Sequence, residues 1–314
     1  MSVTTIDCDY LDRPGFAAAY LLVEGNRAAF VETNTNRAVP RLLEALRAAG
    51  RDPSEVEYVV ITHVHLDHAG GAAALMEACP NATLLAHPRA AKHAIDPSKL
   101  IASARGVYGA EAFDAMYGEI RPVSAERVRV MEDGDSVALG GRTLTFLHTR
   151  GHADHHACVL DSGTNGIFTG DSFGLVYPAL QKNGLFAIPS TSPTDFDAHE
   201  AKKSLDRILE TGAERAYLTH FGEQRDLRGI AAALRAQLDE YGAIADEAFA
   251  SGLEGEALAR FCEERVGAIF ERVLAERGLD GDREAREILA TDRDLNAQGV
   301  AFSVERRRRR AQRG

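Results

Sequence analysis

The residues best suited to chemistry are concentrated in one short segment, Thr62 to Gly71, which reads THVHLDHAGG. His63, His65, Asp67 and His68 fall within six positions and directly follow a short apolar run. Side chains two apart in extended backbone point to the same side, so His63 and His65 can bind one metal ion. Asp67 and His68 can bind a second ion beside it once the chain turns into the helix. Imidazole nitrogens and carboxylate oxygens suit zinc, iron or manganese. The segment therefore predicts two adjacent metal positions.

Strands and helices that could position this segment are predicted from apolar periodicity. Apolar runs predict a hairpin over 16–33 and strands at 58–62, 82–86, 127–131, 136–139, 142–148, 156–161, 166–170 and 216–219. Spacings of three and four predict helices over 38–49, 70–79, parts of 89–118, and 195–211. Helices that accompany strand-rich stretches in both halves of this region fit a layered α/β sandwich of two sheets with helices outside.

Beyond Gly222 the pattern becomes helical, with apolar positions three and four apart over 226–249, 254–277 and 283–290. We therefore expect a catalytic domain over 1–225 and a helical C-terminal extension over 226–314. The apolar faces of these helices suit a cover over the site or a homodimer contact. The run Arg306 to Arg310 is interpreted as a solvated terminus.

The His-rich segment resembles the T-H-x-H-x-D-H signature of the metallo-β-lactamase superfamily, which includes glyoxalase II, acyl-homoserine lactonases, ribonuclease Z and flavodiiron proteins. Further ligands of that family follow in order: a His after a Gly at Gly151-His152, an Asp after a Gly at Gly170-Asp171, and a late His at Thr219-His220. The resemblance covers about residues 16 to 222. It implies a four-layer αβ/βα sandwich.

By this resemblance, seven side chains would hold two divalent metal ions, with zinc expected first and iron or manganese as alternatives. The first ion would take His63, His65 and His152; the second would take Asp67, His68 and His220; Asp171 would bridge them. A hydroxide shared by two ions can form near neutral pH and attack a polarised carbonyl. No serine or cysteine nucleophile is then required.

Two side chains are predicted to take part in catalysis besides the metal ions. Asp67 is expected to receive or relay a proton. Tyr177, which follows Asp171, is expected to donate to a developing oxyanion, by analogy with a tyrosine of some lactonases whose spacing differs. His155 and His156 begin an apparent strand, and a surface or supporting role is favoured over ligation for both.

Residues adjacent to the ligands could orient the imidazoles. Thr62, Thr219 and Ser172 stand beside ligands in the sequence and are predicted to do so. The family often carries Asp at a strand end where this chain has Glu32, whose longer side chain could still reach. The aromatic residues of segment 89–131 are interpreted as packing the helices onto the sheet, with a roof over the site as the alternative. These aromatic residues are Tyr108, Phe113 and Tyr117, and Met116 lies among them.

Composition excludes several classes of protein. The formal net charge of -11 argues against nucleic acid as a partner, because binding a polyanion needs clustered cations. No apolar run reaches the roughly eighteen residues of a membrane span, and no export signal is recognised, so we expect a cytoplasmic location and no membrane partner. Four scattered cysteines make a poor disulfide framework, so reduced, mostly buried thiols are expected.

The leading hypothesis is a binuclear metal-dependent hydrolase that acts on a small carbonyl ester, thioester or lactone through a metal-bridging hydroxide. The alternative is a non-haem di-iron protein that binds, senses or reduces oxygen, or a persulfide-type redox enzyme, on the same fold. Flavodiiron proteins typically place a carboxylate where His65 stands, which argues against that class. Phosphodiester cleavage is a weaker variant, because a basic surface is missing outside the Arg run, and β-lactam hydrolysis is disfavoured by the absent export signal. A non-catalytic relative would be expected to have lost ligands, and none is lost.

Overall fold

The computed structural model describes residues 2–191 and 193–312, and the chain divides into two compact units. Unit 1 contains the chain up to His148 together with His155–Gly170 and Thr211–Arg225. Unit 2 contains Thr149–Asp154, Asp171–Glu210 and the chain from Asp226 onward. The chain passes from unit 1 to unit 2 for the last time between Arg225 and Asp226, where the C-terminal extension is predicted to begin. That the extension forms a separate domain stays a prediction.

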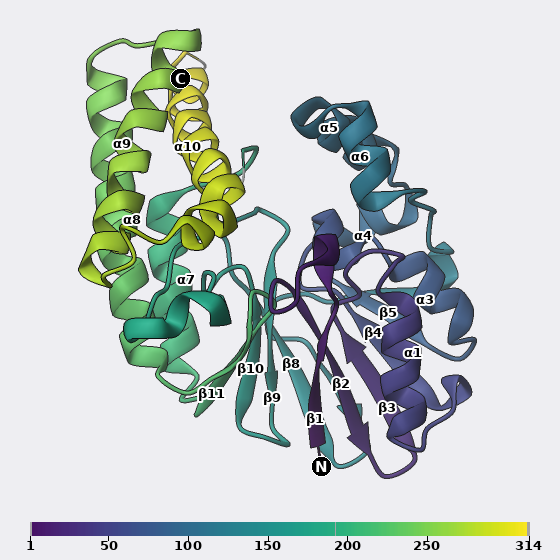
Figure 1. Ribbon diagram of the computed structural model, residues 1–314. Coiled ribbons are helices and arrows are strands. Elements are labelled where there is room, and N and C mark those ends of the chain that lie inside the picture. The colour runs from purple at the N-terminus through teal and green to yellow at the C-terminus, as the bar shows by residue number, and fades with distance from the viewer. Residues whose placement is uncertain (1, 192, 313–314) are drawn as a thin grey trace. The chain divides into compact units, whose positions relative to one another are not determined.

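Unit 1 carries both sheets, each of six strands (Figure 1). The first runs in chain order: β1 (Ser2–Asp7), β2 (Ala18–Glu24), β3 (Arg27–Val31), β4 (Val56–Val60), β5 (Thr83–Ala86) and β6 (Val128–Val130). The second has the order β12 (Gly222–Gln224), β11 (Arg215–Leu218), β10 (Gly166–Gly170), β9 (Ala157–Asp161), β8 (Arg142–His148) and β7 (Ser136–Leu139). Both sheets are mixed: β3 to β6 are parallel, and so are β10 and β11. Two mixed sheets flanked by helices confirm the predicted α/β sandwich.

Strand β2 shows why the sandwich forms, because both of its faces are buried. Ala19 and Leu21 pack with the helices α1 (Val39–Ala48) and α3 (Ala72–Ala78), while Tyr20 and Leu22 face the second sheet and pack with residues such as Phe146. Successive side chains of a strand point to opposite faces, so a strand buried on both sides must be apolar throughout. The continuous apolar run of β2 therefore specifies a central position between two cores.

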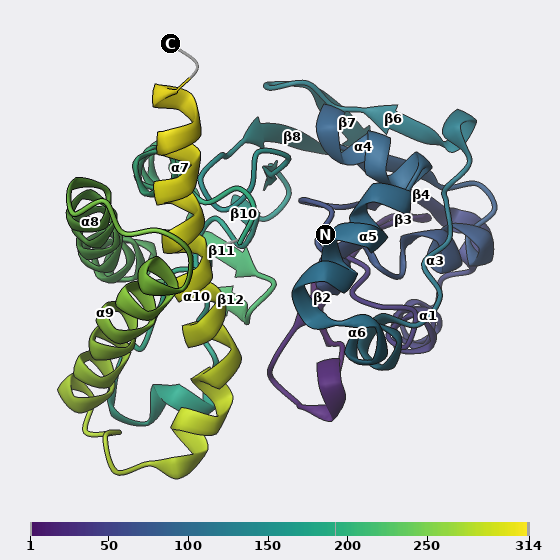
Figure 2. The same cartoon turned by 90° about the horizontal axis from the view of Figure 1, so that it is seen from above.

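The helices of segment 89–118 are α4 (Pro88–Ile95), α5 (Ser98–Tyr108) and α6 (Ala110–Tyr117). Figures 1 and 2 show α5 and α6 beyond the end of the first sheet, on the side where the chain leaves β1 for the short helix at Tyr10–Asp12. Most predicted elements are found within a few residues of their expected bounds. The sequence reading missed β1, which is largely exposed, and β12, which has three residues; neither carries an apolar run.

Unit 2 is built mainly from α7 (Ala198–Glu210), α8 (Leu227–Ala250), α9 (Gly255–Glu276) and α10 (Arg283–Ala311), and the last three lie side by side in both views (Figures 1 and 2). The prediction that the last helix stops at residue 290 is wrong. Its buried stripe contains Asn296, whose side chain accepts from the Thr191 amide at 2.8 Å and donates to the Pro189 carbonyl at 3.0 Å. A polar residue in the buried stripe conceals the helical period from a search for apolar spacing.

The interpretation of the Arg run as a solvated terminus holds for Arg307, Arg309 and Arg310, which are exposed, but α10 continues through the run and two of its arginines are engaged. Arg306 donates to the Asp195 carbonyl and to the Asp197 carboxylate, and Arg308 donates to the carbonyls of Leu253 and Ala248 at the end of α8. Guanidinium groups at a helix C-terminus satisfy carbonyls that have no partner within the helix. These two arginines therefore fasten the end of α10 to the rest of unit 2.

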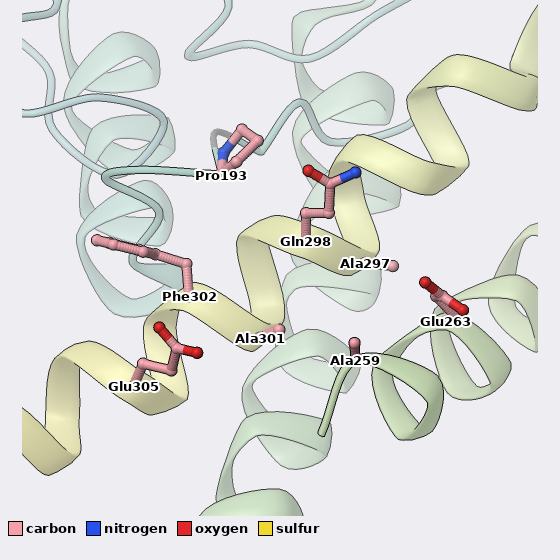
Figure 3. A pocket seen from close by; sticks show the side chains of 8 residues that line it. All are labelled: Pro193, Ala259, Glu263, Ala297, Gln298, Ala301, Phe302 and Glu305. Carbon is pink, nitrogen blue, oxygen red and sulfur yellow. The ribbon is translucent and has the colours of Figure 1, made fainter. Parts of the chain in front are cut away.

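A pocket of about 190 Å³ lies between α9 and α10 (Figure 3). It is lined by Pro193, Ala259, Glu263, Ala297, Gln298, Ala301, Phe302 and Glu305. One of its carboxylates, that of Glu305, already pairs with Arg309 at 3.3 Å. None of the predicted metal ligands lines this pocket, so it does not belong to the candidate site.

The four cysteines Cys8, Cys79, Cys158 and Cys262 are buried thiols that form no disulfide, as expected. Burial raises the pKa of the Cys79 and Cys262 thiols to about 11. Across residues 2–191 and 193–312, none of the helices combines the length and the apolar character that crossing a membrane requires.

Replacing Arg308 with alanine should lower the free energy of unfolding by about 1–3 kcal/mol, because two carbonyls at the end of α8 lose a charged donor. The matched control is Arg310→Ala, since Arg310 is exposed on the same helix and should shift stability by less than about 0.5 kcal/mol. Urea unfolding followed by circular dichroism measures both. Equal losses in the two variants would contradict the role assigned to Arg308.

Candidate metal centre

The predicted ligands of unit 1 follow strands whose carboxyl ends meet at one edge of the sandwich. In the first sheet, Glu32 follows β3 and the His63 segment follows the parallel neighbour β4. In the second sheet, β10 and β11 are parallel, and His220 follows β11. Side chains just beyond the carboxyl ends of parallel strands form a common site in α/β sheets.

Two backbone hydrogen bonds join the sheets at this edge. The Ala157 amide at the start of β9 donates to the Thr62 carbonyl at 2.8 Å, and the Ala18 amide at the start of β2 donates to the Thr219 carbonyl at 2.8 Å. Tyr20 also donates its hydroxyl proton to the Leu218 carbonyl at 2.5 Å. The residues before His63 and His220 are thereby held by the opposite sheet, which brings these two ligands of unit 1 to the same place.

The first pair of ligands is His63 and His65, with Nε2 of the former 2.9 Å from Nδ1 of the latter. This separation is suitable for two nitrogens that address one metal ion. The Nδ1 atom of His63 lies 3.1 Å from the Thr62 hydroxyl, and that hydroxyl donates its proton to Glu32 Oε1. The Thr62 oxygen must therefore accept from Nδ1–H of His63, which fixes the tautomer and leaves Nε2 as the ligand atom.

The second group consists of Asp67, His68 and His220, whose ligand atoms all lie within 4.8 Å of one another. Asp67 Oδ2 is 3.3 Å from His220 Nε2 and 3.6 Å from His68 Nε2. The other nitrogen of each ring faces an oxygen: Nδ1–H of His220 donates to the Phe16 carbonyl at 2.7 Å, and Nδ1 of His68 lies 3.3 Å from Glu32 Oε1. Both rings therefore present Nε2 toward the Asp67 carboxylate.

Unit 2 brings together the two remaining predicted ligands. His152 Nε2 lies 3.5 Å from Asp171 Oδ2, and both side chains are buried. The Ser190 residue supports both: its carbonyl accepts from Nδ1–H of His152 at 3.1 Å, and its hydroxyl donates to Asp171 Oδ2 at 2.9 Å. This pair thus shows the same arrangement as the histidines of unit 1.

These donor sets fit divalent metal ions. Four imidazoles, those of His63, His68, His152 and His220, have Nδ1 directed at an oxygen, and a carboxylate oxygen lies within 3.6 Å of Nε2 in the last three. Metal-binding histidines in proteins usually donate their second nitrogen in this way, which sets the tautomer and the ring orientation. Imidazole nitrogens and carboxylate oxygens are the ligands that zinc, iron and manganese accept.

Glu32 stands where the family often has Asp, and its longer side chain does reach the residues that hold the ligands. Its Oε1 atom accepts from Thr62, faces His68 Nδ1 and lies 3.4 Å from the Thr219 hydroxyl. The residue is 1% exposed and has a φ of 67°, a left-handed conformation that is uncommon outside glycine. This backbone turn directs the side chain under the ligands.

The glycines beside the ligands permit close packing. A Cβ atom on Gly71 would lie 2.8 Å from the Thr35 carbonyl oxygen, because the Gly71 amide donates to the Asn34 carbonyl at 2.7 Å. At Gly170, φ is 47° and a Cβ atom would lie 2.5 Å from both the Thr62 hydroxyl and His156 Nε2. Any larger residue at either position would displace groups that orient the ligands.

Other residues singled out in the sequence occupy supporting or separate places. His156 is fully buried, with its ring 4.8 Å from that of His63, so of the two roles considered for it the surface role is wrong. Thr62 contacts an imidazole, whereas Thr219 contacts Glu32 and Ser172 donates to the Thr149 carbonyl at 3.3 Å.

Tyr177 is buried in unit 2, and its hydroxyl donates to Asp292 Oδ1 at 3.4 Å. Its catalytic role stays a prediction. The sequence reading missed Ser190 and the Phe16 carbonyl as partners of ligands. A backbone carbonyl leaves no signal in residue type, and Ser190 is distant in sequence from both of its partners.

Comparison with known proteins gives a consistent result. The sequence profile of the family described as the metallo-beta-lactamase superfamily matches residues 12–220, more than half of the chain. The metallo-beta-lactamase fold-containing protein ST1585 of Sulfurisphaera tokodaii is 30% identical over 171 residues, 54% of this chain and 61% of that protein. Its crystal structure aligns with a TM-score of 0.67 at 22% identity, over 95% of this chain and 98% of that chain, which shows a shared fold.

Two relatives with named activities match shorter segments. Nitric oxide reductase of Moorella thermoacetica is 30% identical over 129 residues, 41% of this chain and 26% of that protein. N-acyl homoserine lactonase AttM of Rhizobium radiobacter is 31% identical over 119 residues, 38% of this chain and 40% of that protein. The chain therefore spans less than two thirds of these curated relatives.

Replacing Glu32 should weaken metal binding although the residue is not a predicted ligand. Glu32→Gln keeps the shape of the side chain but removes the carboxylate that accepts from Thr62 and faces His68, so the dissociation constant for zinc should rise roughly tenfold. In Glu32→Ala it should rise by up to about 100-fold. Glu57→Gln is the control, since Glu57 lies on β4 and pairs with Arg27 at 2.7 Å on the surface. Competition against a chromophoric chelator measures the constants; unchanged affinity in Glu32→Ala would refute the orienting role.

Proposed function

Because this chain belongs to the metallo-β-lactamase superfamily, we propose that it is a binuclear metal-dependent hydrolase of a small carbonyl ester, thioester or lactone. The superfamily contains metal-dependent hydrolases and oxidoreductases, and the matched residues 12–220 include all seven predicted ligands. The observation that carries the proposal is a shared pattern in four imidazoles: Nδ1 of His63, His152 and His220 is within hydrogen-bond distance of an oxygen, Nδ1 of His68 lies 3.3 Å from Glu32 Oε1, and Nε2 is left to bind a metal in each.

The proposed ligand sets are those that the family resemblance implies. The first ion is assigned to His63, His65 and His152, the second to Asp67, His68 and His220, and Asp171 is the proposed bridge. Zinc is the preferred metal, because it accepts imidazole and carboxylate ligands and leaves coordination positions open in catalytic sites. Iron and manganese accept the same donors.

Two bound ions would supply Lewis acidity and a water of lowered pKa. The chain's own residues would hold the ligands still and move a proton. Asp67 is suited to that second task, because its Oδ2 atom lies between two imidazoles while 23% of its side chain stays exposed. Ser190, Thr62, Glu32 and the Phe16 carbonyl fix the imidazole tautomers, so no ring must reorient when a substrate binds.

The hydrolase is preferred over a redox enzyme for two reasons. The ligand set includes an imidazole, His65, where flavodiiron proteins typically have a carboxylate, and the similarity to a named lactonase supports hydrolysis of a carbonyl compound. The second candidate is a non-haem di-iron protein that binds or reduces oxygen or a related oxidant. It is supported by the similarity to a nitric oxide reductase over 129 residues.

Elemental analysis of protein purified without added metal tests the two candidates. About two zinc ions per chain, with hydrolysis of at least one member of a panel of γ-lactones, aryl esters and thioesters, is expected. About two iron ions, with a visible absorption band that changes on exposure to oxygen, would favour the di-iron candidate instead.

Variants link the metal to the residues. His152→Ala and Asp171→Asn should lose metal together with at least about 100-fold of the hydrolytic rate, because each removes a proposed ligand. His199→Ala is the control, since His199 is exposed near the start of α7 and is not a proposed ligand. Full metal content and full activity in Asp171→Asn would contradict the bridging assignment.

A further inference from the structure

Four histidines of unit 1 form a continuous row of imidazole rings. The ring centroids of His93 and His155 are 6.4 Å apart, those of His155 and His65 are 5.4 Å apart, and those of His65 and His63 are 4.5 Å apart. His155 also stacks on His63, with ring centroids 6.0 Å apart and an angle of 15° between the planes. His63 and His65 are proposed ligands of the first metal ion, whereas His155 and His93 are not. This histidine row therefore continues beyond the ligands themselves.

Exposure to solvent falls along the histidine row. His93, His155 and His65 are half-buried, whereas His63 is fully buried. His93 lies on α4, whose residues Ala90 and Ala91 face the core. The row thus connects half-exposed imidazoles on one side with a fully buried ligand on the other.

Backbone hydrogen bonds hold the two outer histidines in place. His155 stands two residues before Ala157, whose amide donates to the Thr62 carbonyl at 2.8 Å, and Thr62 directly precedes His63. This bond fixes the chain segment of His155 beside that of the ligands. The end of α4 is fixed by the Val123 amide, which donates to the Ala94 carbonyl at 2.8 Å next to His93. The order of the rings is therefore set by the fold.

The spacing of the rings suits imidazoles that share a metal ion in pairs. Zn–N bonds of about 2.0 Å place two imidazoles on one zinc ion with their ring centroids about 5–6 Å apart. His68 and His220, two proposed ligands of the second ion, have ring centroids 5.4 Å apart. His155 lies at this same distance from His65, and its distance from His93 is only slightly larger. A rotation of the half-buried His93 side chain can close that difference.

A metal ion that reaches buried ligands must exchange its bound water for protein ligands. A bare ion in the protein interior is costly, so replacing the water molecules one ligand at a time lowers the barrier. Two imidazoles are fewer ligands than the four of a structural zinc site, so a pair outside the ligand set would hold an ion only weakly. A weakly held ion is released readily to a site with more ligands.

We propose that His93 and His155 form an entry site for a divalent transition-metal ion, which they bind before His65 and His63 do. His155 holds the ion while His65 replaces His93 as its neighbour. One metal–nitrogen bond forms as another breaks, and both imidazoles are neutral, so no proton or electron is transferred. This inference rests on the proposed metal centre, and it concerns the rate at which that centre fills rather than its final ligands.

The rates of zinc binding and zinc release by the full chain test this inference. An entry site lowers the barrier in both directions, so its removal should slow binding and release by the same factor and leave the dissociation constant unchanged. In His155→Gln and His93→Gln, both rates should fall roughly tenfold. The zinc content at saturation should equal that of the wild type. Stopped-flow mixing of the metal-free chain with zinc and a chromophoric indicator measures binding, and transfer of zinc from the loaded chain to excess chelator measures release.

His155→Glu is the matched variant, because glutamate has nearly the shape of glutamine but offers a carboxylate that binds zinc. It should keep both rates within about threefold of the wild type. His199→Gln controls for the loss of an exposed imidazole of unit 2 and should leave both rates unchanged.

Two outcomes would overturn the entry site alone. One is unchanged rates in His155→Gln; the other is faster release with unchanged binding, which marks a residue that only stabilises the filled centre. A wild-type chain that takes up neither zinc nor iron would overturn the proposed metal centre, and the entry site with it.

Discussion

The site depends on one buried carboxylate, that of Glu32. It accepts from the Thr62 hydroxyl, which in turn accepts from His63, and it faces Nδ1 of His68 directly. Two ligands of two proposed metal positions are thus oriented by a single side chain that lies beneath both. A buried carboxylate needs hydrogen-bond donors, and those of Glu32 gather at its Oε1 atom, so this oxygen and its donors must take their places together. Its left-handed backbone is tolerated because the surrounding contacts outweigh its cost.

The edge of the sandwich supplies those contacts. Thr33 and the Asn34 side chain bind the carbonyls of His68 and Asp67, so the loop after β3 follows the ligand helix closely. Two further backbone bonds join the sheets beside His63 and His220. The ligands are therefore placed by backbone hydrogen bonds between strand ends, which are more rigid than flexible side-chain contacts. This rigidity limits the reorganisation needed when a metal ion or substrate binds.

In unit 2, one residue likewise orients two proposed ligands. Ser190 supports His152 with its carbonyl and Asp171 with its hydroxyl, and the next residue of that loop, Thr191, is held by Asn296 of α10. Arg306 and Arg308 hold the end of the same helix. The C-terminal helix thus stabilises the loop that orients two proposed ligands, in addition to closing the packing of α8 and α9.

The sequence by itself determined the α/β sandwich, most of its strands and the first cluster of candidate ligands, because apolar periodicity and the close spacing of His63 to His68 are local properties. The candidates His152, Asp171 and His220 came from the resemblance to the metallo-β-lactamase superfamily. The sequence also raised the question of whether the Glu32 side chain could reach the ligands in place of the family's shorter Asp. Only the tertiary structure decided that it does, that Ser190 and the Phe16 carbonyl hold imidazoles, and that His93 meets His155. The length of α10 and the hydrogen bonds of its arginines could not be predicted from the sequence either. Each of these depends on contacts between residues far apart in the chain, for which neither residue type nor spacing carries a signal.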